Sequence, residues 1–114
     1  MAALLSIIKN MDRKIIKLAQ DFKEMVEKKL GPTEVIIFGS RARGDNDPDS
    51  DLDLAVIADR MDDETLNLIS DCAWEVGFEA GIVVSPIVFT REEVVGVLKE
   101  SPICQTIEKE GIRL

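Results

Sequence analysis

The chain has 114 residues, of which 46% are hydrophobic and 32% charged, and its formal net charge is −8 at pH 7. This size favours a single domain, residues 1–114, with one buried core. The absence of histidine excludes Cys/His zinc sites, Ser-His-Asp triads and Cys-His nucleophile pairs, and the acidic balance argues against a nucleic-acid backbone as the main partner.

The first predicted element is a long helix over residues 6–30, which Gly31-Pro32 ends. Apolar residues recur there at steps of three and four, the spacing of an amphipathic helix. The residues at this spacing are Ile8, Met11, Ile15, Leu18, Phe22 and Met25. Because further apolar residues widen the stripe, a helix that covers a sheet is favoured over a coiled-coil seam.

The rest of the chain alternates β-branched runs with amphipathic segments. The β-branched runs predict strands at residues 34–39, 52–57 and 82–89. The amphipathic segments predict helices at residues 62–81, 90–99 and 101–111, and the capping box formed by Thr90 and Glu93 starts the second of these. The order α-β-β-α-β-α-α predicts an α+β (α/β) fold in which helices cover a small mixed sheet.

Several single residues can be interpreted from these elements. Cys72 and Cys104 lie far apart in predicted helices, so two free thiols are expected rather than a disulfide. Trp74 lies on an apolar helix face and is predicted to belong to the core. No apolar run is long enough to cross a bilayer, and the N-terminal stretch lacks a signal-peptide core, which predicts a cytoplasmic protein with no membrane association.

The loop after the first strand holds five aspartates in nine positions. Three of them, Asp45, Asp47 and Asp49, lie among turn-forming residues and are predicted to be ordinary solvated loop residues. The other two, Asp51 and Asp53, are predicted on the second strand, where alternation points both carboxylates to one face. Two adjoining carboxylates repel each other, and a divalent cation that prefers hard oxygen ligands, such as Mg²⁺, relieves this repulsion.

The end of the first strand carries residues suited to phosphate. Gly39 lets a phosphate approach the backbone, and Ser40 offers a hydroxyl group beside exposed amides. A helical turn starting at residue 40 would add positive potential. Arg41 and Arg43 are candidates for nucleotide binding, with surface counter-ions of the aspartates as the alternative. A metal edge facing a phosphate corner is the arrangement that a Mg²⁺-nucleotide requires.

These residues also match a known signature. Gly39-Ser40, ten residues, and then Asp51-Leu52-Asp53 form the pattern Gly-Ser-x10-Asp-x-Asp. With the GSRARG opening and the ending SPICQTIEKEGIRL, the chain resembles the minimal nucleotidyltransferases (MNT type) of the polymerase-β-like nucleotidyltransferase superfamily. The resemblance implies an αβ core, Mg²⁺ bound by Asp51 and Asp53, and nucleotide phosphates contacted by Ser40.

The resemblance further implies a reaction and a partner. Many minimal members pair with a helical HEPN protein as a toxin–antitoxin couple, and some transfer AMP to a tyrosine of that partner. We therefore expect Mg²⁺-dependent transfer of a nucleoside monophosphate, AMP from ATP, to a hydroxyl group of a partner protein. The chain would be the antitoxin of a HEPN/MNT pair, and because it contains no tyrosine, tyrosine self-modification is excluded.

One departure from the family pattern leaves a second hypothesis open. The family has a third carboxylate on a later strand, but the only polar side chain in the run IVVSPIVF is Ser85. A neutral hydroxyl group is a poor Mg²⁺ ligand and no base. Three nearby carboxylates are weaker substitutes: Glu79, Glu92 and Glu93. The alternative is a catalytically reduced module that binds nucleotide or covers a partner with its first or last helix.

Overall fold

The computed structural model describes residues 13–114, which form one four-stranded mixed sheet and five helices. The strands lie in the order β3-β2-β1-β4. Strand β1 is antiparallel to both its neighbours, whereas β2 and β3 are parallel. Their bounds are β1 (Glu34–Phe38), β2 (Leu52–Ala58), β3 (Val84–Thr90) and β4 (Ile112–Arg113). The predicted α+β fold with a small mixed sheet is therefore confirmed.

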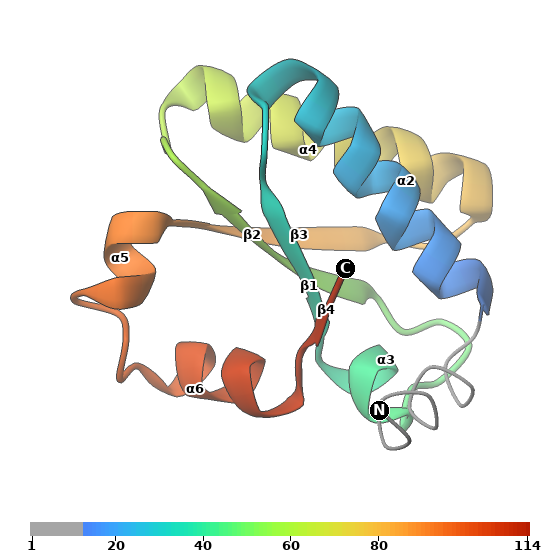
Figure 1. The fold of residues 1–114 in the computed structure, drawn as a ribbon. Helices are drawn as coiled ribbons and strands as arrows, with labels where there is room; N and C mark the ends of the chain where they lie inside the picture. Colours follow the sequence, from blue (N-terminus) through green and yellow to red (C-terminus); the bar gives the residue numbers. More distant parts are fainter. Residues whose placement is uncertain (1–12) are drawn as a thin grey trace.

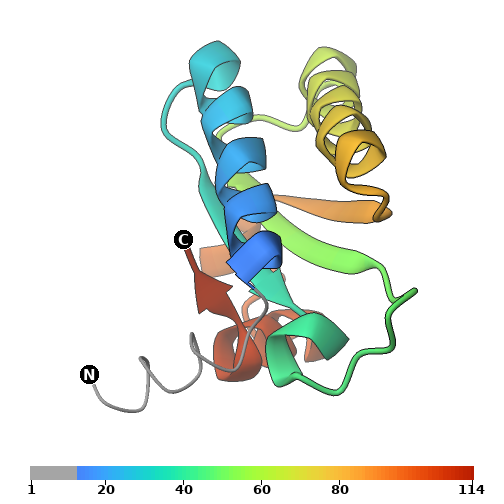
Figure 2. The same ribbon diagram turned by 90° about the vertical axis from the view of Figure 1, so that its right-hand side faces the viewer.

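Helices cover both faces of the sheet. Figure 1 shows two long helices on one side of it and two short ones on the other, and the rotated view in Figure 2 shows the long pair side by side. The long helices are α2 (Arg13–Leu30) and α4 (Asp63–Ala80), and the short ones are α5 (Arg91–Val95) and α6 (Pro102–Glu110). A single helical turn, α3 (Ser40–Arg43), follows β1.

Helix α2 packs its apolar stripe against the sheet and α4. Its buried residues are Ile15, Leu18, Ala19, Phe22 and Val26. The interpretation as a covering helix is thus confirmed over the described residues. The part predicted at residues 6–12 lies outside them.

Alternation along β2 divides the core into two clusters. Leu52, Leu54 and Val56 point toward α2 and α4, while Ala55 and Ile57 point toward α5 and α6. All five side chains are buried, as expected for a central strand with both faces covered. Asp53 lies on the same face as Ala55, so the predicted site is on the side of the two short helices.

Helix α4 approaches the sheet through small residues. Its inner face carries Cys72, Ala73 and Gly77, and a Cβ atom at Gly77 would overlap the carbonyl oxygen of Ile82. The two aromatic side chains of α4, Trp74 and Phe78, lie on its outer face. Trp74 is 69% exposed, so its predicted place in the core is wrong.

The C-terminal third follows its capping signals. The capping box of Thr90 and Glu93 starts α5, and the Ser101 hydroxyl group accepts a hydrogen bond from the Cys104 N–H (3.3 Å) at the start of α6. Helix α5 ends at Val95, four residues before the predicted end, because Gly96 is a poor helix former. The short strand β4 was not predicted.

Two findings bear on the class of protein. Both cysteines are free, as expected, with Cys72 buried and Cys104 half-buried. Between residues 13 and 114, no helix has the length and apolarity that crossing a membrane requires.

Candidate functional site

Asp53 lies at the point where three strands of the sheet meet. In the register of the sheet it is opposite Phe38 of β1 on one side and Ser85 of β3 on the other. Since β1 ends at Phe38, the Gly39-Ser40 corner follows at the same edge. The sheet therefore brings the predicted metal edge and the predicted phosphate corner together.

Gly39 is in direct contact with the Asp53 carboxylate. A Cβ atom at Gly39 would overlap Asp53 Oδ2, and the backbone of Gly39 has φ +78°, which other residues rarely adopt. Only glycine meets both conditions. The chain turns here so closely around Asp53 that a group bound to the carboxylate also lies against the Gly39 backbone.

The helical turn expected after Gly39 is present as α3. The Gly39 carbonyl oxygen accepts hydrogen bonds from the N–H groups of Ala42 and Arg43, both at 3.1 Å, and Gly44, with φ +82°, closes the turn. Ser40 is the first residue of α3 and is half-exposed. The N–H groups of Ser40 and Arg41, at the start of α3, have no acceptor inside that helix.

Asp51 and Asp53 are electrostatically coupled. Burial raises the pKa of Asp53 above its ordinary value of 3.8, the negative charge of Asp51 raises it further, and the positive charge of Arg43 opposes both. Asp51 is exposed and directly precedes β2, so its predicted place on the strand is wrong. The Leu52 N–H, which donates to the Val83 carbonyl oxygen (2.8 Å), holds it at the strand entrance.

Arg41 fastens the loop that leads to these carboxylates. Its guanidinium is buried and donates to two backbone carbonyl oxygens, from Nε to Ser50 (3.0 Å) and from Nη2 to Pro48 (3.2 Å). These bonds hold residues 44–50 against α3. The structure gives Arg41 this positioning role, and its contact with nucleotide stays a prediction.

Arg43 is the more accessible of the two arginines. Its Nε donates to Asp45 Oδ2 (3.0 Å) and its Nη1 to Glu110 Oε2 (3.1 Å). The counter-ion interpretation is thus correct for Asp45. The bond to Glu110 also ties α3 to the end of α6, and the positive charge of Arg43 acts to lower the pKa of Asp53.

The remaining loop aspartates behave as predicted. Asp45, Asp47 and Asp49 are exposed, and a short turn forms in which the Asp47 N–H donates to Ser50 Oγ (2.9 Å). Apart from the ion pair of Asp45, this is a solvated turn. The prediction that these three are turn-forming loop residues is confirmed, whereas of the other two only Asp53 lies on the strand, and the functional role of both stays a prediction.

Ser85 lies directly beside Asp53 on the neighbouring strand. This is the position that a third carboxylate would need in order to share a metal with Asp53. Glu93 is engaged in the capping box of α5, where it accepts the Thr90 N–H (2.9 Å). Within residues 13–114, no group of three or more His, Cys, Asp or Glu side chains is placed to hold a metal ion. Asp51 and Asp53 are the two carboxylates that this edge presents, and two carboxylates are enough for Mg²⁺ that nucleotide phosphates also bind. Their binding of Mg²⁺ stays a prediction.

The sequence analysis missed two contacts, one at this site and one on α4. Glu110 is 67 residues from Arg43 in the chain, and nothing local marks it as an ion-pair partner. The rings of Trp74 and Phe78 stack on the surface of α4, with centroids 4.9 Å apart and planes at 11°. Their spacing of four residues was visible, but it does not distinguish an exposed pair from a buried one.

Comparisons with known proteins bear on the family and the fold of the chain. The model of the nucleotidyltransferase domain family matches residues 15–114. Among solved structures, the chain is similar to a crystal structure of a toxin–antitoxin with AMP-PNP, at 23% sequence identity and a TM-score of 0.53, over 88% of this chain and 68% of that chain. At this identity the likeness shows a shared fold. No curated protein matches the chain.

Proposed function

The chain belongs to the nucleotidyltransferase domain family, and from this premise we propose that it transfers AMP from ATP to a hydroxyl group of a partner protein. The observation that carries the proposal is the contact between Gly39 and the Asp53 carboxylate. It makes one small corner of the protein suitable for both a phosphate and a metal ion.

Each residue of the corner has a role in this proposal. Asp51 and Asp53 would hold Mg²⁺, which when bound neutralises phosphate charge and polarises the reacting phosphoryl group. Gly39 and Ser40 contact the β- and γ-phosphates of ATP, and Arg43 supplies positive charge at the same edge. Arg41 keeps the loop before Asp51 in place.

In the proposed reaction the acceptor oxygen attacks the α-phosphorus in line. A new phosphorus–oxygen bond forms, the bond to the bridging oxygen breaks, and pyrophosphate leaves with that electron pair. Because Ser85 is neutral, it cannot take the acceptor proton, which passes to solvent or to a group of the partner. The contribution of this chain is positioning and charge neutralisation.

A protein acceptor is supported by the outer face of α4. Trp74, Phe78 and Val83 are 69%, 73% and 65% exposed, and such apolar patches mark interaction surfaces. The patch is bordered by a helix that carries five acidic residues and no basic one, so two copies of it repel each other. The patch therefore suits a different protein with an apolar contact face and basic flanks. We propose a HEPN-type helical partner, as in a toxin–antitoxin pair.

Replacing both Trp74 and Phe78 with Ala is expected to weaken the complex with this partner about tenfold or more, since exposed aromatic residues are common interface hot spots. The thermal unfolding of the isolated protein should change little because both rings are exposed. Titration calorimetry with the protein encoded by the neighbouring gene measures the effect. Val97→Ala, another highly exposed apolar position, is the control. Equal affinities of the double variant and the wild type would contradict the assignment.

A second candidate function is favoured by Ser85 alone. Without a third carboxylate, the protein would bind nucleotide and cover its partner but transfer nothing. This hypothesis keeps the nucleotide corner and the aromatic patch and removes only the chemistry. The two functions therefore differ in one observable, a covalent nucleotide on the partner.

The deciding experiment incubates the protein with Mg²⁺ and each nucleoside triphosphate, with and without the neighbouring gene product. Intact-protein mass spectrometry should show that product gaining the mass of AMP when ATP is present. Nucleotide binding with no mass gain on any protein would support the second candidate. The absence of both binding and mass gain would refute the proposal.

A further inference from the structure

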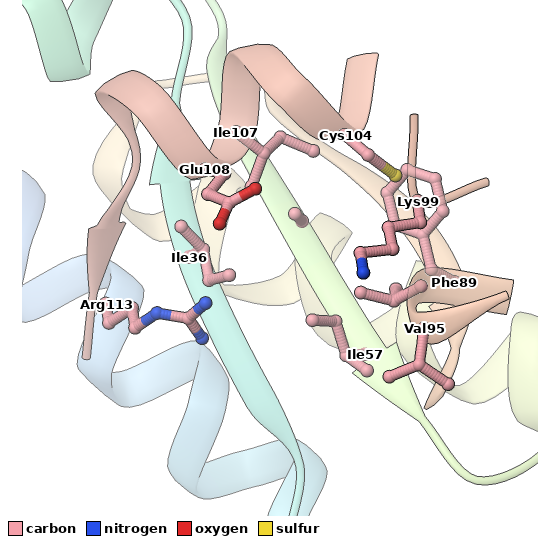
Figure 3. Close-up of a pocket in the computed structure, with 11 residues that line it drawn as sticks. Ile36, Ile57, Phe89, Val95, Lys99, Cys104, Ile107, Glu108 and Arg113 are labelled. Carbon is pink, nitrogen blue, oxygen red and sulfur yellow. The ribbon is translucent and has the colours of Figure 1, made fainter. Parts of the chain in front are cut away.

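An apolar pocket of about 230 Å³ lies between the sheet and the two short helices. Figure 3 shows Ile36 and Ile57 on the strands and Phe89 and Ile107 around the same space, with the charged ends of Lys99 and Glu108 close to it. Surface hollows with mainly apolar walls and a few polar groups are where proteins bind small molecules, so this pocket is a candidate ligand site. No part of the proposed function above uses it.

The pocket lies on the same face of β2 as the Asp53 carboxylate. Asp53, Ala55 and Ile57 alternate to this face, and the pocket is lined by Ala55 and Ile57. Residues two apart on a strand are about 7 Å apart along it. The pocket therefore begins about 7 Å from Asp53, a distance that the sugar of a nucleotide can span. Ala55 leaves space at this point because it is the smallest side chain on that face of β2.

We propose that this pocket receives the base and sugar of the donor nucleotide whose phosphates lie at Asp53. This inference rests on the proposed function. The apolar side chains of Ile57, Phe89 and Ile107 suit contact with the faces of a base. Lys99 offers a donor and Glu108 an acceptor for polar groups on the base edge or the sugar.

The size of the pocket agrees with partial enclosure of the nucleotide. Whole small-molecule ligands occupy roughly 300–1,000 Å³, and this pocket is smaller. It therefore suits a base with its sugar, while the triphosphate remains outside at the open edge beside Gly39. The pocket walls are mainly apolar, with charged groups only at Lys99, Glu108 and Arg113, whereas the edge beside Gly39 carries the carboxylates.

Filling the pocket tests the inference. Cys104 lines it from α6 and is half-buried, so Cys104→Phe places a ring into existing space. The affinity for Mg²⁺·AMP-PNP should fall about tenfold or more, and the affinity for Mg²⁺·tripolyphosphate should stay unchanged. Ile103→Phe, the adjacent position outside the pocket, is the matched control and should bind both probes as the wild type does.

Three results would overturn the inference while leaving the proposed function intact. They are an unchanged affinity for AMP-PNP in a folded Cys104→Phe protein, an equal loss for both probes, and a loss of partner modification with unchanged AMP-PNP binding. The last would assign the pocket to the acceptor side chain. The Asp53→Asn variant tests the proposed function separately. If that function is wrong, this variant will bind both Mg²⁺·AMP-PNP and Mg²⁺·tripolyphosphate as the wild type does.

A second measurement needs no variant. In the wild-type protein, the methyl NMR signals of Ile57 and Ile107 should shift by ring-current effects when Mg²⁺·AMP-PNP is added and stay in place with Mg²⁺·tripolyphosphate. Methyl signals that respond equally to both probes would contradict the placement of the base.

Discussion

Replacing Asp53 with Asn is expected to reduce nucleotide transfer to the partner about 100-fold or more, because it removes the half-buried carboxylate that lies against Gly39. The amide keeps the size of the side chain and removes its charge, so the fold and the partner surface should be preserved. The rate of AMP-sized mass gain on the partner measures the effect. Asp49→Asn, which changes an exposed loop aspartate, is the matched control and should transfer at the wild-type rate.

The same variant should be more stable than the wild type when divalent cations are removed with EDTA. Burial and Asp51 raise the pKa of Asp53 in the folded protein, so the ionised carboxylate destabilises the fold at neutral pH. The melting temperature of Asp53→Asn should exceed that of the wild type by about a few degrees. This difference should shrink as the pH falls through the raised pKa and vanish below 3.8, the ordinary value of an aspartate.

With Mg²⁺ and nucleotide present, the wild type should be the more stable of the two proteins. A cation shared by Asp51 and Asp53 relieves their repulsion, so adding Mg²⁺ with AMP-PNP should raise the melting temperature of the wild type and not that of the variant. Equal transfer by Asp53→Asn and the wild type would refute the catalytic role. Equal stabilisation of both proteins by Mg²⁺ and nucleotide would refute the ligand role.

Replacing Ser85 with Asp is expected to increase nucleotide transfer about tenfold or more. Ser85 is opposite Asp53 in the parallel register of β2 and β3, so the new carboxylate would lie beside the existing one and could share a metal or accept the acceptor proton. Initial rates of partner modification at saturating ATP measure the gain. Ser85→Asn has a similar size without the charge and should show none.

A stability cost should accompany this gain. A third carboxylate next to Asp53 adds like-charge repulsion, which raises the pKa of Asp53 further and lowers the melting temperature in EDTA. Mg²⁺ should restore much of the lost stability. If Ser85→Asp binds Mg²⁺ more tightly but transfers no faster, the missing carboxylate is not what limits the reaction, and the partner supplies the limiting group.

Much of the fold was available from local sequence signals. Each predicted strand has a counterpart within two residues of its bounds. The helix caps Thr90, Ser101 and Gly81 lie at the predicted positions. These signals are local because a cap or a β-branched run acts on its own few residues. Two elements departed from prediction: α5 ended early, before Gly96, and the two-residue strand β4 was not predicted.

The candidate site was predicted by spacing rather than by any single residue. Gly39 and Ser40 at a fixed distance from Asp51 and Asp53 are ordinary residues when taken separately. The two strands on either side of this loop pair in antiparallel orientation, so the start of β2 lies at the same edge of the sheet as the end of β1. The turn-forming composition of the loop was enough to predict that Asp45, Asp47 and Asp49 are loop residues outside the site.

The sequence by itself determined which side chains share a face of each element, because alternation and helical periodicity are properties of the backbone. Only the tertiary structure decided which faces meet. The pairing of Asp53 with Ser85, the contact of Asp53 with Gly39 and the bond from Arg43 to Glu110 all join separate elements. The exposure of Trp74 likewise depends on which face of α4 packs against the sheet. Such contacts depend on the packing of whole helices and strands, which no local pattern encodes.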